Sequence, residues 1–273
     1  MVMERKCRYV PLSQQPLVLV LAQVRFSPVR QLAEYIPEIQ DDFRRYGFPL
    51  ELAGEVQQLI FGPGGGLPTR VTSQPRWEYR TKDETWSILV MENSVVLQTT
   101  SYQRFEGFAE KLHHAVETVL AKTEHDKFGV IERVGLRYID LVRPREGEDF
   151  RDYLRPGLHG VSDEVFNAGT QRLHIESTGT TEVGDLEGTL VIRVVQNDDG
   201  YSLPPDLLGA APVHTPRSTK GELVTLIDMD HFIQGKFEPS ADQVVAHAYA
   251  MHDQLVETFH EHVATKEAIE VWR

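Results

Sequence analysis

The sequence of 273 residues contains a single cysteine, Cys7. No disulfide can form within the chain, and a zinc site built on thiolates would lack most of its ligands. Long apolar runs are missing too: Pro16–Ala22 is too short to cross a bilayer and is followed at once by Gln23 and Arg25. The amino-terminal residues have no apolar stretch of signal-peptide length. These absences predict a protein of a bacterial or otherwise reducing cytoplasm, with no membrane span.

Positive charge is also scarce. Asp and Glu number 41 against 28 Lys and Arg, which gives a formal net charge of −13. Affinity for nucleic acid depends mainly on Lys and Arg that neutralise phosphates, so this balance argues against a nucleic-acid partner and against an anionic membrane surface. The apolar fraction of 41% is that of an ordinary globular protein, and the length suits one large domain or two smaller ones.

Familiar catalytic and phosphate-binding motifs are absent. The sequence contains no G-x-x-x-x-G-K-[ST], no G-x-G-x-x-G after a strand, no H-E-x-x-H and no G-x-S-x-G. The run Gly64–Gly66 has no lysine beside it and no Ser or Thr that opens a helix, so a loop between strands is the favoured interpretation. We therefore predict no cofactor.

Apolar periodicity predicts an α+β first half, residues 1–125. A nearly continuous apolar strand, Leu17–Phe26, precedes a helix in which Ser27 is the N-cap and Pro28 lies in the first turn. Four shorter strands follow, and a long helix over about Gln103–Lys122 closes the half. The four strands are predicted at Glu55–Phe61, Arg76–Thr81, Thr85–Met91 and Ser94–Thr99.

The second half, residues 126–273, repeats this order with a strand over Val130–Val142, a short helix near Asp149–Leu154, three strands and a long helix over Ser240–Ala264. The three strands are predicted at Arg172–Ser177, Thr189–Gln196 and Leu223–Gln234. The repeated order predicts duplication of one unit, although chance similarity is the alternative. Two such units would form one wide antiparallel sheet with the long helices on one face, as in helix-grip or TATA-box-binding-protein-like folds.

Each long helix has apolar residues at helical spacing, which predicts one buried stripe on each. The predicted stripes are Phe105, Phe108, Leu112, Val116 and Val119 in the first helix and Val244, Ala248, Met251, Leu255 and Phe259 in the second.

Residues 198–221 depart from every periodic pattern. Their four prolines cannot donate ladder hydrogen bonds, yet the segment also contains Leu203 and Leu207, which a solvated linker would not need. This mixture predicts a segment outside the core that is mobile or is ordered by a partner, and that docks on a second subunit or covers a pocket. The alternative is a long excursion packed on its own domain.

Glu-x-x-His occurs once in each long predicted helix, at Glu110/His113 and Glu257/His260. A spacing of three places both side chains on one helix face, as carboxylate-bridged metal sites require. Such sites also need carboxylates from two further helices, which the sequence does not clearly offer, so solvated helix faces are favoured and no metal is predicted. Four histidines wind around the last long helix and are predicted on the surface: His247, His252, His260 and His262.

Asp228 and Asp230 lie two apart on a predicted strand, beside His231, and so point to the same face. Paired carboxylates can do acid–base work or bind a divalent cation. Because the alternating residues Ile227 and Met229 are apolar, a polar strand face above a packed one is the favoured interpretation.

Arg25 and Arg137 each occupy an otherwise apolar strand at matching places in the two halves. A buried guanidinium needs a carboxylate or carbonyl partner, so a structural interpretation pairs each with Asp or Glu between the halves. A functional interpretation presents the two guanidiniums to an anionic ligand, with aromatic residues as an apolar wall. The candidate wall residues are Tyr138, Trp77, Trp86 and Tyr102.

Four stretches of the sequence carry a family resemblance: Pro16–Phe26, Trp86–Phe108, Val134–Val142 and Phe259–Arg273. Over almost the whole chain, the sequence resembles a sporadically distributed bacterial family of uncharacterised proteins of about this length. Members of that family usually have Asn at the position of Asp140. The resemblance implies architecture and a bacterial source, but no activity and no catalytic residue.

Two functional hypotheses follow from these features. The first is a non-catalytic binding or scaffold protein, whose partner is another protein or a second copy in a homodimer. The second is a small-molecule-binding or hydrolytic enzyme that uses a cavity between the sheet and the long helices. The first is favoured because no nucleophile–base or metal signature stands out and because residues 198–221 are predicted to form a long irregular loop. A deep pocket with converging polar groups would favour the second, and a flat apolar patch the first.

Overall fold

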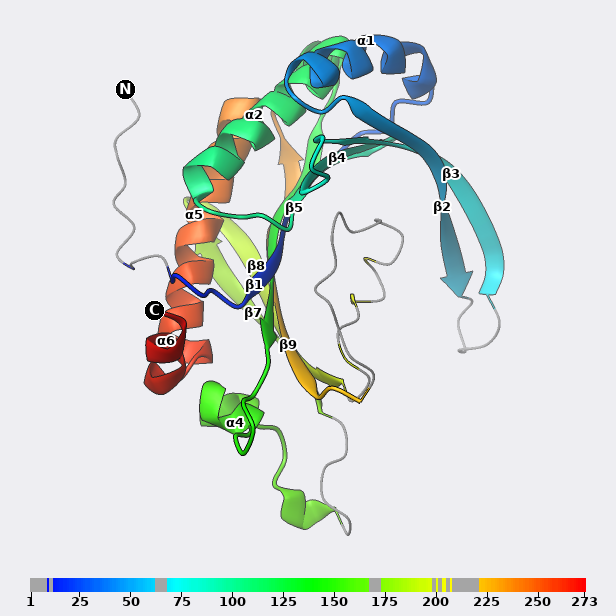
Figure 1. Ribbon diagram of the computed structural model, residues 1–273. Helices are drawn as coiled ribbons and strands as arrows, with labels where there is room; N and C mark the ends of the chain where they lie inside the picture. Colours follow the sequence, from blue (N-terminus) through cyan, green and yellow to red (C-terminus); the bar gives the residue numbers. More distant parts are fainter. Residues whose placement is uncertain are drawn as a thin grey trace.

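The computed structural model describes residues 9, 12–61, 68–166, 173–197, 200, 203–204, 207 and 221–273, with the backbone alone at 56–61 and 68–73. The described chain forms one nine-stranded antiparallel sheet whose long helices pack on a single face (Figure 1). The predicted α+β class with a wide antiparallel sheet is confirmed. Among the helices that the structure describes, none is long and apolar enough to cross a membrane.

The elements follow the predicted order, with two additional short helices, α3 and α6, that were not predicted. The described residues of the first half form β1 (Leu17–Phe26), α1 (Leu32–Arg45), β2 (Leu50–Phe61), β3 (Pro68–Arg80), β4 (Trp86–Met91), β5 (Ser94–Thr99), α2 (Phe105–Lys122) and the single turn α3 (His125–Phe128). Those of the second half form β6 (Ile131–Val142), α4 (Phe150–Tyr153), β7 (His174–Val183), β8 (Leu186–Asn197), β9 (Val224–Phe237), α5 (Ala241–Thr258) and α6 (Lys266–Trp272). Two short 3-10 turns, Pro156–Leu158 and Asp163–Val165, precede β7, and a π-helical turn, Phe259–Val263, joins α5 to α6.

The strand order across the sheet is β2-β3-β4-β5-β1-β6-β9-β8-β7. The first strands of the two halves, β1 and β6, lie side by side in the middle, with Val20 opposite Tyr138 and Val24 opposite Val134. Outward from this pair, each half continues with its last strand and works back toward its earlier ones. The order is therefore the same on both sides apart from one additional strand, β2, and the two halves share one continuous sheet.

The long helices α2 and α5 contact each other and cover the middle of the sheet (Figure 1). Every residue of both predicted stripes is buried, which confirms the stripes as core. On the sheet, alternate residues of β1 such as Val20, Ala22 and Val24 belong to the same helix-side core. Fully burying one Val, Leu or Phe side chain stabilises the fold by about 1.5–3 kcal/mol, so this layer is the main source of stability.

The start of α1 differs from the prediction. The helix begins at Leu32 with Gln31 as N-cap, and Ser27 does not cap it. Ser27 Oγ instead accepts a hydrogen bond from the Val130 amide at 3.2 Å, and its carbonyl oxygen lies 2.7 Å from His125 Nε2. Ser27 therefore connects the end of β1 to the start of the second half. It makes this tertiary contact and not the predicted N-cap of α1.

The sheet face opposite the helices, called here the open face, carries a second apolar cluster. Leu203, from the segment 198–221, is buried in this cluster with 8% of its surface exposed, and Leu207 packs against it. The prediction that this segment stays outside the core is wrong at Leu203, because the open face offers apolar side chains to cover. Most of the segment lies outside the described residues. The other buried members of the open-face cluster are Leu19, Leu21, Leu89, Val96, Ile139, Leu141, Val224 and Leu226.

Candidate functional site

A buried ion pair lies on the open face between β6 and β9. Arg137 donates from Nε and Nη2 to the two carboxylate oxygens of Asp228, both at 2.6 Å. Both side chains are almost fully buried, at 6% and 2% exposure. Two parallel charge-assisted hydrogen bonds of this kind hold both groups in one geometry. Arg137 therefore has an acidic partner, and this partner belongs to its own half and not to the other half of the chain.

This pair is part of a ladder of alternating charges across β6, β9, β8 and β7. Arg133 Nη2 lies 3.2 Å from Asp230. Beyond the central pair, Arg193 contacts Asp228 at 3.4 Å and Glu176 at 2.6 Å. Burial raises the pKa of Asp230, while the charges of Arg133 and Arg137 act against that shift. Three guanidiniums and three carboxylates compensate one another here, which allows charges to be buried on the sheet.

The Arg133–Asp230 pair of this ladder depends on a neighbouring glycine. The Arg133 guanidinium lies beside Gly135, so closely that a Cβ atom at Gly135 would stand 2.4 Å from Arg133 Nη1. Arg133 also donates to Gln23 Oε1 at 3.1 Å, and its guanidinium carbon lies 4.4 Å from the ring centroid of Phe232. The absence of a side chain at Gly135 is what lets the guanidinium lie against the sheet.

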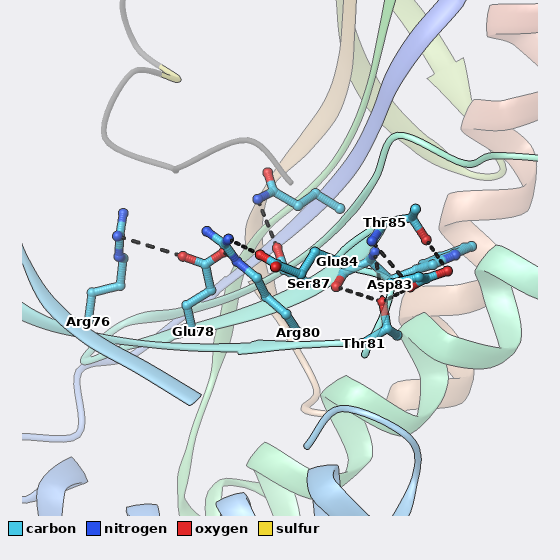
Figure 2. A network of polar contacts seen from close by, with 10 residues as sticks. Arg76, Glu78, Arg80, Thr81, Asp83, Glu84, Thr85 and Ser87 are labelled. Atoms are coloured by element: carbon cyan, nitrogen blue, oxygen red, sulfur yellow. Dashed lines mark hydrogen bonds and ion pairs between the residues drawn. The ribbon is translucent and has the colours of Figure 1, made fainter. Parts of the chain in front are cut away.

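A second polar network occupies the open face of the first half (Figure 2). Glu78 is fully buried and accepts a hydrogen bond from Arg80 Nε at 2.7 Å, while Arg76 approaches its other carboxylate oxygen at 3.7 Å. Arg80 also contacts Glu84 at 2.9 Å. These four residues balance in charge as the ladder does. Beside them, Gln98 donates to Ser87 Oγ at 2.9 Å.

The six residues predicted to bind a ligand do not form one site. Arg137 lies on the open face, whereas the adjacent Tyr138 points to the helix side, because successive residues of a strand face opposite ways. Arg25 is exposed, and it lies opposite Arg133, not beside Arg137. The three remaining aromatic residues pack against the helix-side core and are Trp77, Trp86 and Tyr102.

The helix side contains a buried polar contact that the sequence did not indicate. Tyr138 Oη lies 2.7 Å from His252 Nδ1, and the imidazole stacks on Phe105 with centroids 4.2 Å apart. Burial lowers the pKa of His252 to about 4, so the ring is neutral near pH 7. The prediction that His252 lies on the surface is wrong, because His252 lies on the buried face of α5 together with Ala248 and Leu255. Aromatic rings fill this part of the layer between sheet and helices.

The predicted acidic and histidine pairs have other partners. Asp228 and Asp230 share the open face, as their spacing predicts, but they pair with arginines. His113 Nε2 lies 3.0 Å from Asp242 across α2 and α5, and His260 stacks on Tyr9. Within the part of the chain that the structure describes, no group of three or more His, Cys, Asp or Glu could hold a metal ion.

Ser27 and His125 form the described Ser–His contact that most resembles a nucleophile and its base, with Oγ 3.2 Å from Nε2. The same Nε2 lies 2.7 Å from the Ser27 carbonyl oxygen, to which it must donate, and Ser27 Oγ accepts from the backbone of Val130. An imidazole nitrogen that donates to a carbonyl cannot take a proton from the hydroxyl. This contact therefore joins the two halves and does not activate Ser27.

Comparisons with protein-family models, with curated proteins and with solved structures found no match to this chain.

Several charged residues of the open face were not predicted from the sequence. Arg133 lies four residues before Arg137 on the same strand, so strand parity alone places both on one face. Arg193 and Glu78 gave no comparable signal, because their roles depend on which strands lie next to β8 and β3.

Proposed function

We propose that this protein is a non-catalytic binding protein, and that it holds an extended segment of another protein chain on the open face of its sheet. The observation that carries the proposal is the burial of Leu203 in the open-face cluster. The open-face cluster contains no residue of α2 or α5, yet it accepts the apolar side chains of Leu203 and Leu207, which belong to no strand of the described sheet. A partner segment with similarly spaced apolar residues would use the same contacts.

The polar groups beside the cluster support binding over chemistry. Each carboxylate of the ladder and of the Glu78 network lies beside at least one guanidinium, so these groups hold one another in place on the open face. The alternative, an enzyme with a cavity between the sheet and the long helices, gains less support, because the Tyr138–His252 contact and the ring of Phe105 occupy part of that layer.

The experiment tests whether the open face binds the apolar residues of this segment. Full-length protein with Leu203→Ser and Leu207→Ser is titrated against a labelled peptide of residues 200–210 (GYSLPPDLLGA), and binding is followed by fluorescence anisotropy. We expect saturable binding to this variant and weaker binding to the wild type, because the tethered segment competes at a high effective concentration. A peptide with the same two Leu→Ser changes is the control. If neither peptide binds, or both bind equally, the open face is not a docking surface.

We also propose that the two halves arose by duplication and that the fold is of the TATA-box-binding-protein-like or helix-grip kind. Support comes from the strand order, which is mirrored about the central β1–β6 pair. Each half also ends with a long helix on the same face. Superposition of residues 16–122 on 130–264 tests this: if α2 and α5 do not overlay when the strands do, the halves are unrelated.

Membership of the bacterial family described above, and a location in the cytoplasm, remain proposals that rest on the sequence. The resembling stretches include both central strands, and the single cysteine fits a reducing compartment. Measuring where the native protein lies in fractionated cells of its source would test the location.

A further inference from the structure

The outer backbone edge of strand β7 pairs with no other described strand. β7 (His174–Val183) is the last strand of the sheet and pairs only with β8. Seven of its ten residues are exposed. In the described part of the chain, one hydrogen bond reaches its outer edge, from the Gln254 side chain to the Glu182 carbonyl oxygen. A strand with unpaired backbone groups on one side is a template for another strand.

The hairpin between β7 and β8 determines which residues of β7 point their backbone groups outward. Val183 pairs with Leu186 across a two-residue turn, so the backbone groups of Val183 bond to β8. Alternation along the strand then directs the amides and carbonyls of the even-numbered residues outward. The contact from Gln254 to the carbonyl oxygen of Glu182 agrees with this parity. An added antiparallel strand must therefore match its own outward residues to these.

We propose that a second copy of this chain pairs with β7 in antiparallel fashion, around a twofold axis through Thr178. Backbone parity then places Thr178 opposite Thr178, Glu176 opposite Thr180 and His174 opposite Glu182. No like charges face each other, His174 meets a carboxylate twice, and threonine pairs favour strand contact. The nine residues His174–Glu182 of each copy take part. This inference is independent of the function proposed for the open face.

Charge selects this register over its neighbour. Moving the twofold axis to Gly179 keeps the parity and pairs nine residues as well, but it places Glu176 opposite Glu182 twice. Like charges directly opposite each other destabilise a strand pair. Moving the axis to Ser177 leaves only seven residues of each β7 in the pairing. The Thr178 register therefore has the longest overlap without repulsion.

Exposed apolar side chains follow the residue that packs on the start of β7. Gly160 packs so closely on the start of β7 that a Cβ there would stand 2.7 Å from Leu173 Cδ1 and 3.5 Å from Ile175 Cδ1. Of the large apolar side chains exposed in the described chain, Val161, Val165 and Phe166 all follow within six residues of Gly160. In the antiparallel dimer this end of β7 adjoins the β7–β8 turn of the partner, which gives these side chains a surface to pack on.

Paired charge variants test the axis. Sedimentation equilibrium of the full-length wild type should give the dimer mass, whereas Thr178→Lys and Thr178→Glu should each give the monomer mass, because like charges meet on the axis. An equimolar mixture of the two variants should return to the dimer mass. Thr189→Lys, which adds the same charge one strand in from the edge, is the control and should stay dimeric. Circular dichroism melts establish that each variant is folded.

Several results would overturn the proposal: a monomeric wild type at its highest attainable concentration, single variants that remain dimers, or a mixture that stays monomeric. Crosslinking provides a second test that does not depend on charge. Thr178→Cys in a Cys7→Ser background should form a covalent dimer on mild oxidation, since opposite residues of a hydrogen-bonded pair lie about 5.5 Å apart at Cα, within disulfide range. Thr189→Cys in the same background should not crosslink, and equal crosslinking of both variants would contradict the Thr178 axis.

Discussion

Replacing Asp140 with Asn should remove a large pH dependence from the stability of this protein. Asp140 lies in β6, between Leu17 on β1 and Ile227 on β9, at the centre of the sheet. Strand parity places its side chain on the helix side with Tyr138, and the residue is 4% exposed. Burial raises the pKa of Asp140 from 3.8 to about 8, because a buried carboxylate loses its hydration.

The direction and size of the effect follow from proton linkage. The folded protein holds the Asp140 proton between about pH 4 and pH 8, whereas the unfolded chain has released it. Stability from this group is therefore full below the unfolded pKa and is lost as pH rises through the folded pKa. Each pH unit inside this window corresponds to about 1.4 kcal/mol, so the loss between pH 5 and pH 7 is roughly 2–3 kcal/mol.

The assay is urea unfolding of the wild type and of Asp140→Asn at pH 5, 6 and 7. Asn cannot ionise but has nearly the shape of the protonated acid, so the variant should gain on the wild type by roughly 2–3 kcal/mol across this range. The quantity to compare is the difference in free energy of unfolding between the two proteins at each pH. His252 is present in both proteins, so its opposite effect on stability cancels in this difference. With its lowered pKa, His252 contributes stability that is lost as pH falls below about 6.5.

A matched control is Asp126→Asn, at an exposed position on α3. Its difference from the wild type should not change with pH by more than a few tenths of a kcal/mol, as for a surface substitution. A difference between Asp140→Asn and the wild type that stays constant from pH 5 to pH 7 would refute the reasoning. It would mean that Asp140 is already ionised in the folded protein.

Three further predictions concern packing and the charge ladder, and urea melts check each. Leu112→Ala and Leu255→Ala, in the buried stripes, should each cost about 2–5 kcal/mol, and a loss under about 1 kcal/mol would show that the stripe is not core. Arg137→Met should cost about 3–5 kcal/mol because it removes the bidentate partner of the buried Asp228, and addition of Asp228→Leu should recover most of that loss. Gly135→Ala should displace Arg133 and cost about 1–3 kcal/mol, whereas the same change in an Arg133→Ala background should cost less than half as much.

The sequence by itself determined the main strands and long helices and the apolar stripes of those helices. Period-2 and period-3.6 patterns located β1, β6, α2 and α5 and both apolar stripes, because burial of one face is a local property of each element. The same parity correctly placed Asp228 and Asp230 on one side of β9. Strand parity also places the adjacent residues Arg137 and Tyr138 on opposite faces of β6. The predicted anion site, which combined these two residues, was therefore inconsistent with the strand itself.

The tertiary structure decided which elements lie next to one another, and with that every partner on the open face. Arg137 meets Asp228 because β9 pairs with β6, although more than 80 residues separate them in the chain. The burial of Asp140 follows from the place of β6 at the centre of the sheet. His252 is buried because α5 packs against both α2 and β6. These outcomes depend on long-range strand pairing, and hydrophobic periodicity carries no information on which strands will pair.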